Sequence, residues 1–585
     1  MTATKKILLL VIGLVLSYSL GVWGLYTFLK AQNPDTFVLP SALYYALQML
    51  FLNVPNFSEQ MPIPFVIGRS LSGIIFALVS AKVVYVLLYK EITNLRLIFI
   101  KDHLVICGLG DIGLPIAFQA REKGANPVVI VHTFEESIVK SLAKKGIPVI
   151  VGNPSDKSVL SQAKASRAKT VMALCEDDDW NTEIAYQLNT LNLSVGSAEK
   201  LECILFLKSI SLLAALQGLN FFPHNDPAFS INIRSLNMYA FCARTAFSGI
   251  PYNHLSLYKD SGKQPQIIII GFGNMGQSIA VQAAKIAHFP SGGKLKIHVI
   301  DEHAKKRMDQ IRNNYPNFHL VADMEEIEGV LEDPNARKRV IDIYKNADKE
   351  GSLMTCVICD DEEETENLVQ SLSLVNELHE SQTPILVYQT SASGFSQLLR
   401  YKAGGHNIQN QLIPFGMTSE LWSFEAIKDE KQDQLAKALH KIYLDDFECQ
   451  ENGIDAQKNP SQLPWDRLNE SFRESNRSAA DHIPVKLAVL GLKTCPFDNS
   501  VERENIPKLD ETQVEILSKI EHARWCAERW LSGWTYGSVR DNSARIHPDL
   551  VEWDKLRKES QYIDKRIMSS IHRALETVGE GIVSV

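Results

Sequence analysis

Two long apolar segments near the start of the chain limit its possible folds more than any other feature. Residues 7–29 carry no charge over 23 positions, enough for a helix to cross a hydrocarbon layer of about 30 Å at roughly 1.5 Å per residue. A second apolar segment, residues 63–89, is interrupted only by Arg69 and Lys82. A signal peptide is the competing interpretation of the first segment, but its length and the lack of an Ala-x-Ala cleavage site argue against one. We therefore predict two transmembrane helices.

Basic residues indicate the orientation of these helices. Lys5 and Lys6 precede the first segment, and Lys90, Arg96 and Lys101 follow the second. Lys and Arg are enriched on the cytoplasmic side of membrane helices. We therefore expect a multi-pass protein of the cell (inner) membrane, with both termini and the large C-terminal region in the cytoplasm.

The apolar segment between the two helices is too short to span a membrane. Residues 39–52 have helical character, and such a short element persists at membrane depth only where protein or a water-filled cavity covers it. We predict a re-entrant pore helix. Lys82 either reaches the membrane interface with its long side chain or lines the pore and favours anions. The predicted pore residues are Asn53, Val54, Pro55 and Asn56.

Length, charge and cysteine content restrict the rest of the chain. Its 585 residues require several domains, and a net charge of −8 with interspersed signs argues against a nucleic-acid surface. The nine cysteines are scattered through apolar runs, as is typical of reduced cytoplasmic thiols. Cys356 and Cys359 form a CxxC pair without a second ligand pair, so we predict no metal site.

A glycine-rich motif follows the first strand-like run after the membrane segments. Residues 104–107 precede Gly108, Gly110, Asp111 and Gly113, and a helical run comes next. This order places backbone amides and the positive end of a helix where a pyrophosphate binds.

The same pattern recurs about 160 residues later in the chain. An isoleucine-rich run precedes Gly271, Gly273, Asn274, Met275 and Gly276. The repeat indicates an internal duplication, and we predict two tandem α/β Rossmann domains. Their predicted bounds are 101–255 and 256–428.

The two copies differ where a ribose is expected to bind. Asp301 ends the second strand of the later copy and can accept bonds from ribose hydroxyls, whereas His132 ends the matching strand of the first. We therefore predict NAD or another adenine nucleotide in the second domain rather than the first, with Asp323 lining the same crevice. The alternative is that the glycines only permit tight strand-to-helix packing. The acidic runs 176–179 and 360–364 either bind a cation or are solvated strand ends.

From about residue 429 the sequence becomes polar, helix-rich and populated by tryptophans. Glu521, Arg524 and Glu528 recur on one helix face, and Gly533 is expected to end that helix. Aromatic rings beside arginines can sandwich a nucleobase and hold a phosphate, and a small tryptophan core is the alternative. The predicted ligand-binding residues are Arg524, Trp534, Tyr536, Arg540 and His547, the last four of them expected at the surface.

These segments together resemble a known channel family. Two helices, a short helix between them and the motif in residues 103–113 are similar to potassium channels gated by RCK (TrkA-N) domains, and residues 146–155 and 168–174 resemble later strands of those domains. The resemblance implies rings of Rossmann domains that change shape on binding a nucleotide or cation and pull on the inner helix. Residues 42–46 look like the start of the family's pore helix. Residues 51–57, however, lack the Thr-Val-Gly-Tyr-Gly filter, which leaves potassium selectivity in doubt.

The C-terminal segment resembles the RyR domain, the repeat found in ryanodine receptors. The shared pattern comprises an acidic-His-x-x-Trp helix in residues 521–525, Gly-Trp-x-Tyr-Gly in residues 533–537 and His-Pro-x-Leu in residues 547–550. We predict a mainly α-helical RyR-like domain over residues 429–585, after a pore module in residues 1–100.

No catalytic constellation stands out, so we expect a binding protein and not an enzyme. The predicted function is a nucleotide-gated ion channel with a non-standard filter, acting with membrane lipids, ions and a nucleotide ligand as a homotetramer. The alternatives are a non-conducting membrane-anchored nucleotide sensor and an NAD-dependent oxidoreductase.

Overall fold

The computed structural model describes residues 3–51, 53, 61–193, 201–219, 230–258, 262–360, 364–378, 381, 383–389, 412–416, 422–428, 430–448, 460–496 and 509–584. The chain divides into two compact units, Met1–Ile100 and Lys101–Val585.

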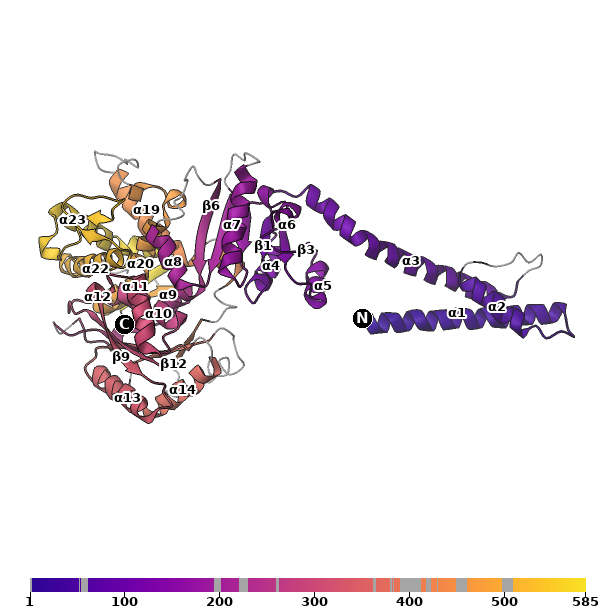
Figure 1. The fold of residues 1–585 in the computed structure, drawn as a ribbon, viewed down its shortest axis with the longest axis horizontal. Coiled ribbons are helices and arrows are strands. Elements are labelled where there is room, and N and C mark those ends of the chain that lie inside the picture. Colours follow the sequence, from indigo (N-terminus) through magenta and orange to yellow (C-terminus); the bar gives the residue numbers. More distant parts are fainter. Residues whose placement is uncertain are drawn as a thin grey trace. The chain divides into compact units, whose positions relative to one another are not determined.

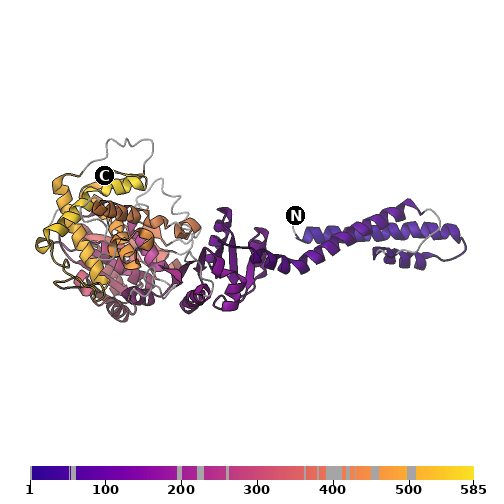
Figure 2. The same cartoon turned by 90° about the horizontal axis from the view of Figure 1, so that it is seen from above.

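Three helices form the first unit, with a short helix packed against two long ones (Figure 2). Segments Val11–Gln32 and Ile63–Ala81 are long and apolar enough to cross a membrane, as predicted from length and composition. The predicted short apolar segment is helical, but the pore residues Val54 to Asn56 lie outside the described part of the chain. The helices are α1 (Ala3–Gln32), α2 (Leu39–Leu50) and α3 (Ile63–Ile98).

Small residues bring α1 and α3 into backbone contact. A Cβ atom added to Gly68 would lie 2.8 Å from the carbonyl oxygen of Ser17, whose hydroxyl donates a hydrogen bond to the Gly68 carbonyl over 2.8 Å. Ser72 Oγ donates to the Met49 carbonyl over 2.9 Å, which ties α3 to α2. Helices in a membrane typically pack through small residues, which allow close approach, and through hydroxyl hydrogen bonds. Burial of apolar side chains does not drive them together, because the surrounding lipid is equally apolar.

The second unit begins with a six-stranded parallel sheet with helices on both faces (Figure 1). Its strand order is β3-β2-β1-β4-β5-β6, the order of a dinucleotide-binding Rossmann fold. The strands are β1 (Leu104–Cys107), β2 (Pro127–Val131), β3 (Val149–Val151), β4 (Thr170–Ala173), β5 (Leu201–Leu207) and β6 (Ile231–Asn237). The helices are α4 (Gly113–Glu122), α5 (Glu136–Lys144), α6 (Lys157–Gln162), α7 (Asp178–Leu193), α8 (Ile210–Leu219) and α9 (Met238–Ser248).

A second parallel sheet repeats this topology. Its order, β9-β8-β7-β10-β11-β12, corresponds strand for strand to that of the first sheet, so the predicted tandem Rossmann arrangement is confirmed. The strands are β7 (Gln266–Ile270), β8 (Leu295–Asp301), β9 (Ala322–Glu328), β10 (Leu353–Ile358), β11 (Ile385–Tyr388) and β12 (Leu412–Phe415). The helices are α10 (Asn274–Ile286), α11 (Ala304–Asn314), α12 (Phe318–Val321), α13 (Pro334–Lys349) and α14 (Glu364–Glu377).

The C-terminal region is mainly helical and packs on both Rossmann sheets. Trp422 and Phe424 join the core of the first sheet, although the sequence placed them at the end of the second domain. Ala527 and Leu531 instead join the core of the second sheet. The helices are α18 (Phe424–Lys428), α19 (Gln434–Glu448), α20 (Glu470–Asp481), α21 (Ile483–Val489), α22 (Glu511–Leu531), α23 (Lys558–Ser569) and α24 (Ile571–Thr577). The short strands are β13 (Leu492–Pro496), β14 (Thr535–Tyr536), β15 (Ile546–His547) and β16 (Glu580–Ser584).

Candidate functional site

The glycine loop of the first Rossmann sheet has the geometry that its motif predicts. Gly108 has a φ of +97°, and a Cβ atom there would lie 2.7 Å from the Leu174 carbonyl oxygen. A side chain at Gly113 would overlap the Gly108 carbonyl. Gly110 differs, because the nearest atom to an added Cβ is Glu176 Oε1 at 3.7 Å. Two of the glycines therefore shape the loop, and the third leaves space beside it.

A cavity of about 510 Å³ lies at the carboxyl ends of β1, β2 and β4, beside this loop. Ligands of open α/β sheets bind in this position, beyond the carboxyl ends of the strands where the strand order reverses. Its lining includes Gly108, Gly110, His132, Glu176, Asp177 and Trp180.

Two aromatic side chains meet within this cavity. The rings of His132 and Trp180 lie 4.8 Å apart, centre to centre, at an interplanar angle of 71°. Trp180 is held in place by its neighbour Asn181, which accepts a bond from the Cys175 amide over 2.9 Å and donates to the carbonyls of Cys175 and Phe206. Sequence reasoning identified His132 but missed Trp180, because α7 brings it to the site from far along the chain.

Hydrogen bonds between strands correct the predicted match between the two ribose positions. The Gly108 amide donates to Ile130, and the equivalent Gly271 amide donates to Ile300. The first-domain counterpart of Asp301 is therefore the next residue, Val131, and His132 lies one position further on. The prediction from sequence matched His132 to Asp301 and was therefore wrong by one residue. A run of apolar residues does not by itself show which residue of one strand corresponds to which residue of the other.

The second glycine loop also begins with a glycine at positive φ, but the carboxylate beside it is bound by the protein itself. Asp301 is 7% exposed and accepts bonds from the Phe272 amide at 2.7 Å and the His303 amide at 2.7 Å. The Arg307 guanidinium donates to the same carboxylate over 2.8 Å. Phe272 is fully buried where the first domain has the half-buried Leu109. The carboxylate predicted to receive ribose hydroxyls is therefore already satisfied by three internal donors.

Other residues predicted around the second loop are not brought into a common site. Met275 is fully buried in the core, and Asn274 opens α10. The prediction that Asp323 lines the crevice is wrong. It assumed a strand ending at Asp323, but residues 318–321 form a helix and β9 begins at Ala322. Asp323 pairs in register with Lys296, while Asp301 pairs with Glu328 at the opposite end of the sheet.

The acidic runs act mainly on the backbone. Asp177 Oδ1 accepts from the amides of Asp179 and Trp180 at the start of α7, and Asp178 accepts from the amides of Lys208 and Ser209. Asp360 is bound through its backbone to Asn367, and residues 361–363 lie outside the described ranges. Among the described residues, no group of three or more His, Cys, Asp or Glu side chains is placed to hold a metal ion.

The predicted ligand residues of the C-terminal domain divide into a buried and an exposed set. Trp534 is 6% exposed and His547 is 9% exposed, so the expectation that they face solvent is wrong. Tyr536 is 62% exposed and Arg540 is exposed, as expected. Arg524 is buried and binds Glu521 through two hydrogen bonds of 2.9 and 3.0 Å.

Trp534 is one of three aromatic rings around a second arginine that the sequence did not single out. The Arg529 guanidinium carbon lies 5.2 Å from the centre of the Trp534 ring, 5.7 Å from Trp525 and 5.4 Å from Phe472. Burial, together with the positive charge of Arg540, lowers the pKa of His547 to about 4. The tryptophans here form a small core around a cation, which corresponds to the alternative given above for these rings.

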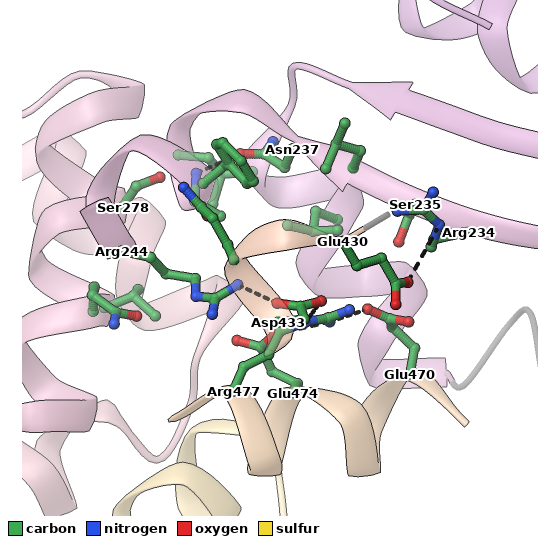
Figure 3. Close-up of a pocket in the computed structure, with 18 of the residues that line it drawn as sticks. Arg234, Ser235, Asn237, Arg244, Ser278, Glu430, Asp433, Glu470, Glu474 and Arg477 are labelled. Carbon is green, nitrogen blue, oxygen red and sulfur yellow. Dashed lines mark hydrogen bonds and ion pairs between the residues drawn. The ribbon is translucent and has the colours of Figure 1, made fainter. Parts of the chain in front are cut away.

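A charged cluster joins all three parts of the second unit around a cavity of about 110 Å³ (Figure 3). Arg244 of α9 donates to Asp433 over 3.0 Å and to Asp481 over 2.8 and 3.0 Å. Arg477 of α20 binds the other oxygen of Asp433 over 2.8 Å, and Lys285 of α10 lies 2.6 Å from Glu474. We call these six residues the junction cluster. No motif predicts it, because α9, α10 and α20 meet only in the folded chain.

The charges of the junction cluster are mutually stabilised. Burial alone would raise the pKa of Asp433, but Arg477 and Arg244 hold it below its usual value. Burial likewise opposes ionisation of Glu474, and Lys285 and Arg477 reverse that effect. A buried charge whose partner is removed is costly, so the cluster favours one relative arrangement of the three parts.

Comparison with known proteins identifies two of these regions. Residues 104–199 match the TrkA-N domain family, and residues 495–583 match the RyR domain family. The voltage-gated potassium channel Kch of Escherichia coli (strain K12) is 23% identical over 189 residues, which cover 30% of this chain and 45% of Kch. The chain thus spans less than half the length of this relative. The resemblances to an RCK-gated, potassium-channel-like protein and to the RyR domain are confirmed.

Solved structures of the GsuK channel are also similar to this chain. The crystal structure of GsuK bound to ADP is 13% identical, covers 73% of this chain and 97% of that chain, and gives a TM-score of 0.37. The GsuK channel bound to NAD is 12% identical, covers 88% and 89% respectively, and gives a TM-score of 0.35. Scores at this level do not establish a common overall arrangement.

Proposed function

We propose that this protein is a nucleotide-gated ion channel of the RCK-regulated class, assembled as a homotetramer in the cell membrane. A nucleotide binds in the crevice of the first Rossmann domain and shifts the equilibrium between closed and open pores. The observation that carries the proposal is the open crevice at the Gly108 loop, in a TrkA-N-matching domain that follows the second apolar helix directly in sequence.

The link between crevice and pore is short and held at one end. Helix α3 ends at Ile98 and β1 begins at Leu104. Within that link, the Asp102 amide donates to the Arg167 carbonyl over 2.9 Å, and buried His103 lies within 2.9 Å of the Ala163 carbonyl. Because the link is short and its far end is bound to the first Rossmann domain, we expect a movement of that domain to be passed to α3.

The choice of the first crevice revises the expectation from sequence. The second domain has the Asp301 carboxylate, but that group already accepts hydrogen bonds from Arg307 and from two backbone amides. We therefore assign NAD or another adenine nucleotide to the first domain and a structural role to the second. The C-terminal RyR-like domain is the other candidate for the ligand, through the exposed Tyr536 and Arg540.

The pore proposal is supported by the two apolar helices and by the similarity of this chain to the voltage-gated potassium channel Kch. We assign the role of pore helix to α2, and we expect substitutions in residues 53–56 to change which ions pass. Because this sequence has no filter glycine, permeation does not follow a stacked carbonyl ladder, and the permeant ion has to be identified by measurement.

The test is ion flux through the purified full-length protein in liposomes, under separate potassium, sodium and chloride gradients. ADP, ATP, NAD and cyclic nucleotides are added in turn to each preparation. We expect flux that depends on one of these nucleotides, is abolished by Gly110→Asp and keeps its nucleotide dependence in Asp301→Asn.

Two other functions would give different results in the same assay. A non-conducting sensor would bind a nucleotide in the first domain with no flux under any gradient. An NAD-dependent oxidoreductase would turn over NAD in the presence of a reducible or oxidisable substrate, and residues 53–56 would have no effect on it.

A further inference from the structure

We propose that the first-domain crevice recognises its nucleotide through the base and the phosphates and is indifferent to the ribose hydroxyls, with Trp180 and His132 as the base-binding platform. The inference rests on the proposed function, because it concerns the same crevice. It specifies the class of ligand as a nucleoside diphosphate moiety without a further phosphate on its ribose.

The position equivalent to Asp301 in this crevice has no side-chain acceptor. Hydrogen-bond register makes Val131 the counterpart of Asp301, and Val131 is buried and apolar. Two further backbone bonds support the same alignment, since the amides of Gly152 and Gly329 donate to the carbonyls of Val131 and Asp301 respectively. At this position no buried polar group of the protein loses a partner when a ribose hydroxyl is removed from the ligand. The crevice therefore discriminates weakly between ligands with and without that hydroxyl.

Aromatic rings replace the missing carboxylate as the recognition element. His132 follows β2 and Trp180 lies in the first turn of α7, which follows β4, so the two side chains come from the strands on either side of β1. Because the two rings meet edge to face, one of them touches the other only through its edge, and neither of its faces is covered by that contact. Both rings line the cavity. Stacking of a base on an aromatic side chain is favourable and tolerant of base identity.

The charges around the cavity limit the number of phosphates. Its described lining includes Glu135, Glu176 and Asp177 but no lysine or arginine. Phosphates are therefore bound by the backbone amides of the glycine loop and the start of α4, a site suited to one pyrophosphate. A 2′-phosphate would have no cation to pair with and would face these carboxylates.

The second domain provides a matched control. Asn367 holds the β10 loop through the same bonds that Asn181 makes in the first domain, and the residue before it is Glu366 instead of Trp180. A substitution at Glu366 thus changes the equivalent position without affecting the proposed platform.

The experiment is calorimetric titration of the full-length protein in nanodiscs with two matched pairs of ligands, ADP with 2′-deoxy-ADP and NAD with NADP, which differs from NAD only by a 2′-phosphate. For the native protein we expect affinities for ADP and 2′-deoxy-ADP within about twofold of each other, and affinity for NADP at least about tenfold lower than for NAD. Trp180→Ala should weaken ADP binding by about tenfold or more, whereas Trp180→Phe stays within about threefold and Glu366→Ala has no effect.

The outcomes separate this inference from the proposed function. If Gly110→Asp abolishes ADP binding but Trp180→Ala binds normally, the platform is refuted while the first-domain site stands. If loss of the 2′-hydroxyl lowers affinity by more than about tenfold, indifference to the ribose hydroxyls is refuted and the first-domain site again stands. If ADP still binds to the Gly110→Asp protein, the first-domain site fails and this inference fails with it. A Trp180→Ala protein that unfolds is replaced by Trp180→Leu, for which the same loss is expected.

Discussion

The two Rossmann domains share a topology and differ in the side chains that surround their glycine loops. Both have a glycine at positive φ, at +97° for Gly108 and +84° for Gly271, and both use an asparagine to hold the loop after the fourth strand. In the first domain the loop borders a cavity lined in part by His132 and Trp180, whereas in the second the Asp301 carboxylate beside the loop accepts hydrogen bonds from Arg307 and from the Phe272 amide. The same loop geometry is therefore surrounded by different side chains in the two domains.

The second domain packs with both of its neighbours. Its main core continues into Cys242 and Phe247 of α9 and into Ala527 and Leu531 of α22. Under the proposed function the first domain senses the ligand and the second supports the assembly.

The largest contrast is expected from placing a carboxylate in each glycine loop. Gly110→Asp should weaken nucleotide binding by more than about 100-fold, because a negative charge then faces the phosphates. The side chain fits, since only Glu176 Oε1 approaches an added Cβ, at 3.7 Å. Gly273→Asp should leave affinity within about twofold, and calorimetric titration measures both. Loss of binding in Gly273→Asp alone would reverse the assignment of the two domains.

The junction cluster should make the two domains unfold together. Arg244→Ala leaves Asp433 and Asp481 without their shared guanidinium, and we expect a loss of about 3–5 kcal/mol in the free energy of unfolding. Differential scanning calorimetry of the full chain should then show separated transitions. Arg312→Ala, which breaks an exposed pair with Asp309, should cost no more than about 1 kcal/mol. Equal effects of both substitutions would contradict the role of the cluster.

Removal of the charge on Asp301 should lower stability but not nucleotide affinity. Asp301→Asn loses the charge-assisted bond to Arg307, for which we expect about 1.5–3 kcal/mol of destabilisation in urea denaturation. Nucleotide affinity should stay within about twofold of the native value. A tenfold loss of affinity would show that this carboxylate contacts the ligand and would return the site to the second domain.

The smallest expected effect is a pH dependence in the second domain. Burial lowers the pKa of His298 to about 4, despite Glu325 Oε2 at 3.2 Å, whereas the unfolded chain has a value near 6.5. The unfolded state therefore binds more protons between these values, and stability should fall by roughly 1–2 kcal/mol from pH 7 to pH 5. His298→Gln should remove this part of the pH dependence of urea denaturation. An unchanged slope would mean that His298 is not neutral in the folded protein.

Much of the fold followed from the sequence. The uncharged residues 7–29 predicted a membrane-length helix, and the repeated glycine motif predicted two α/β domains, because both signals are local and periodic. The pattern in residues 521–550 predicted the RyR resemblance. Errors arose where no local signal exists: in the strand register at Val131, in the strand boundary near Asp323, and in the burial of Trp534 and His547.

The sequence by itself determined which segments become helices and strands and where a loop can approach a phosphate, since glycine spacing and apolar periodicity act over a few residues. Only the tertiary structure decided which side chains surround each glycine loop. In the second domain Arg307 reaches Asp301, and in the first Trp180 reaches His132. It also decided that α9, α10 and α20 share buried charges, because such pairs form only between residues that folding brings together.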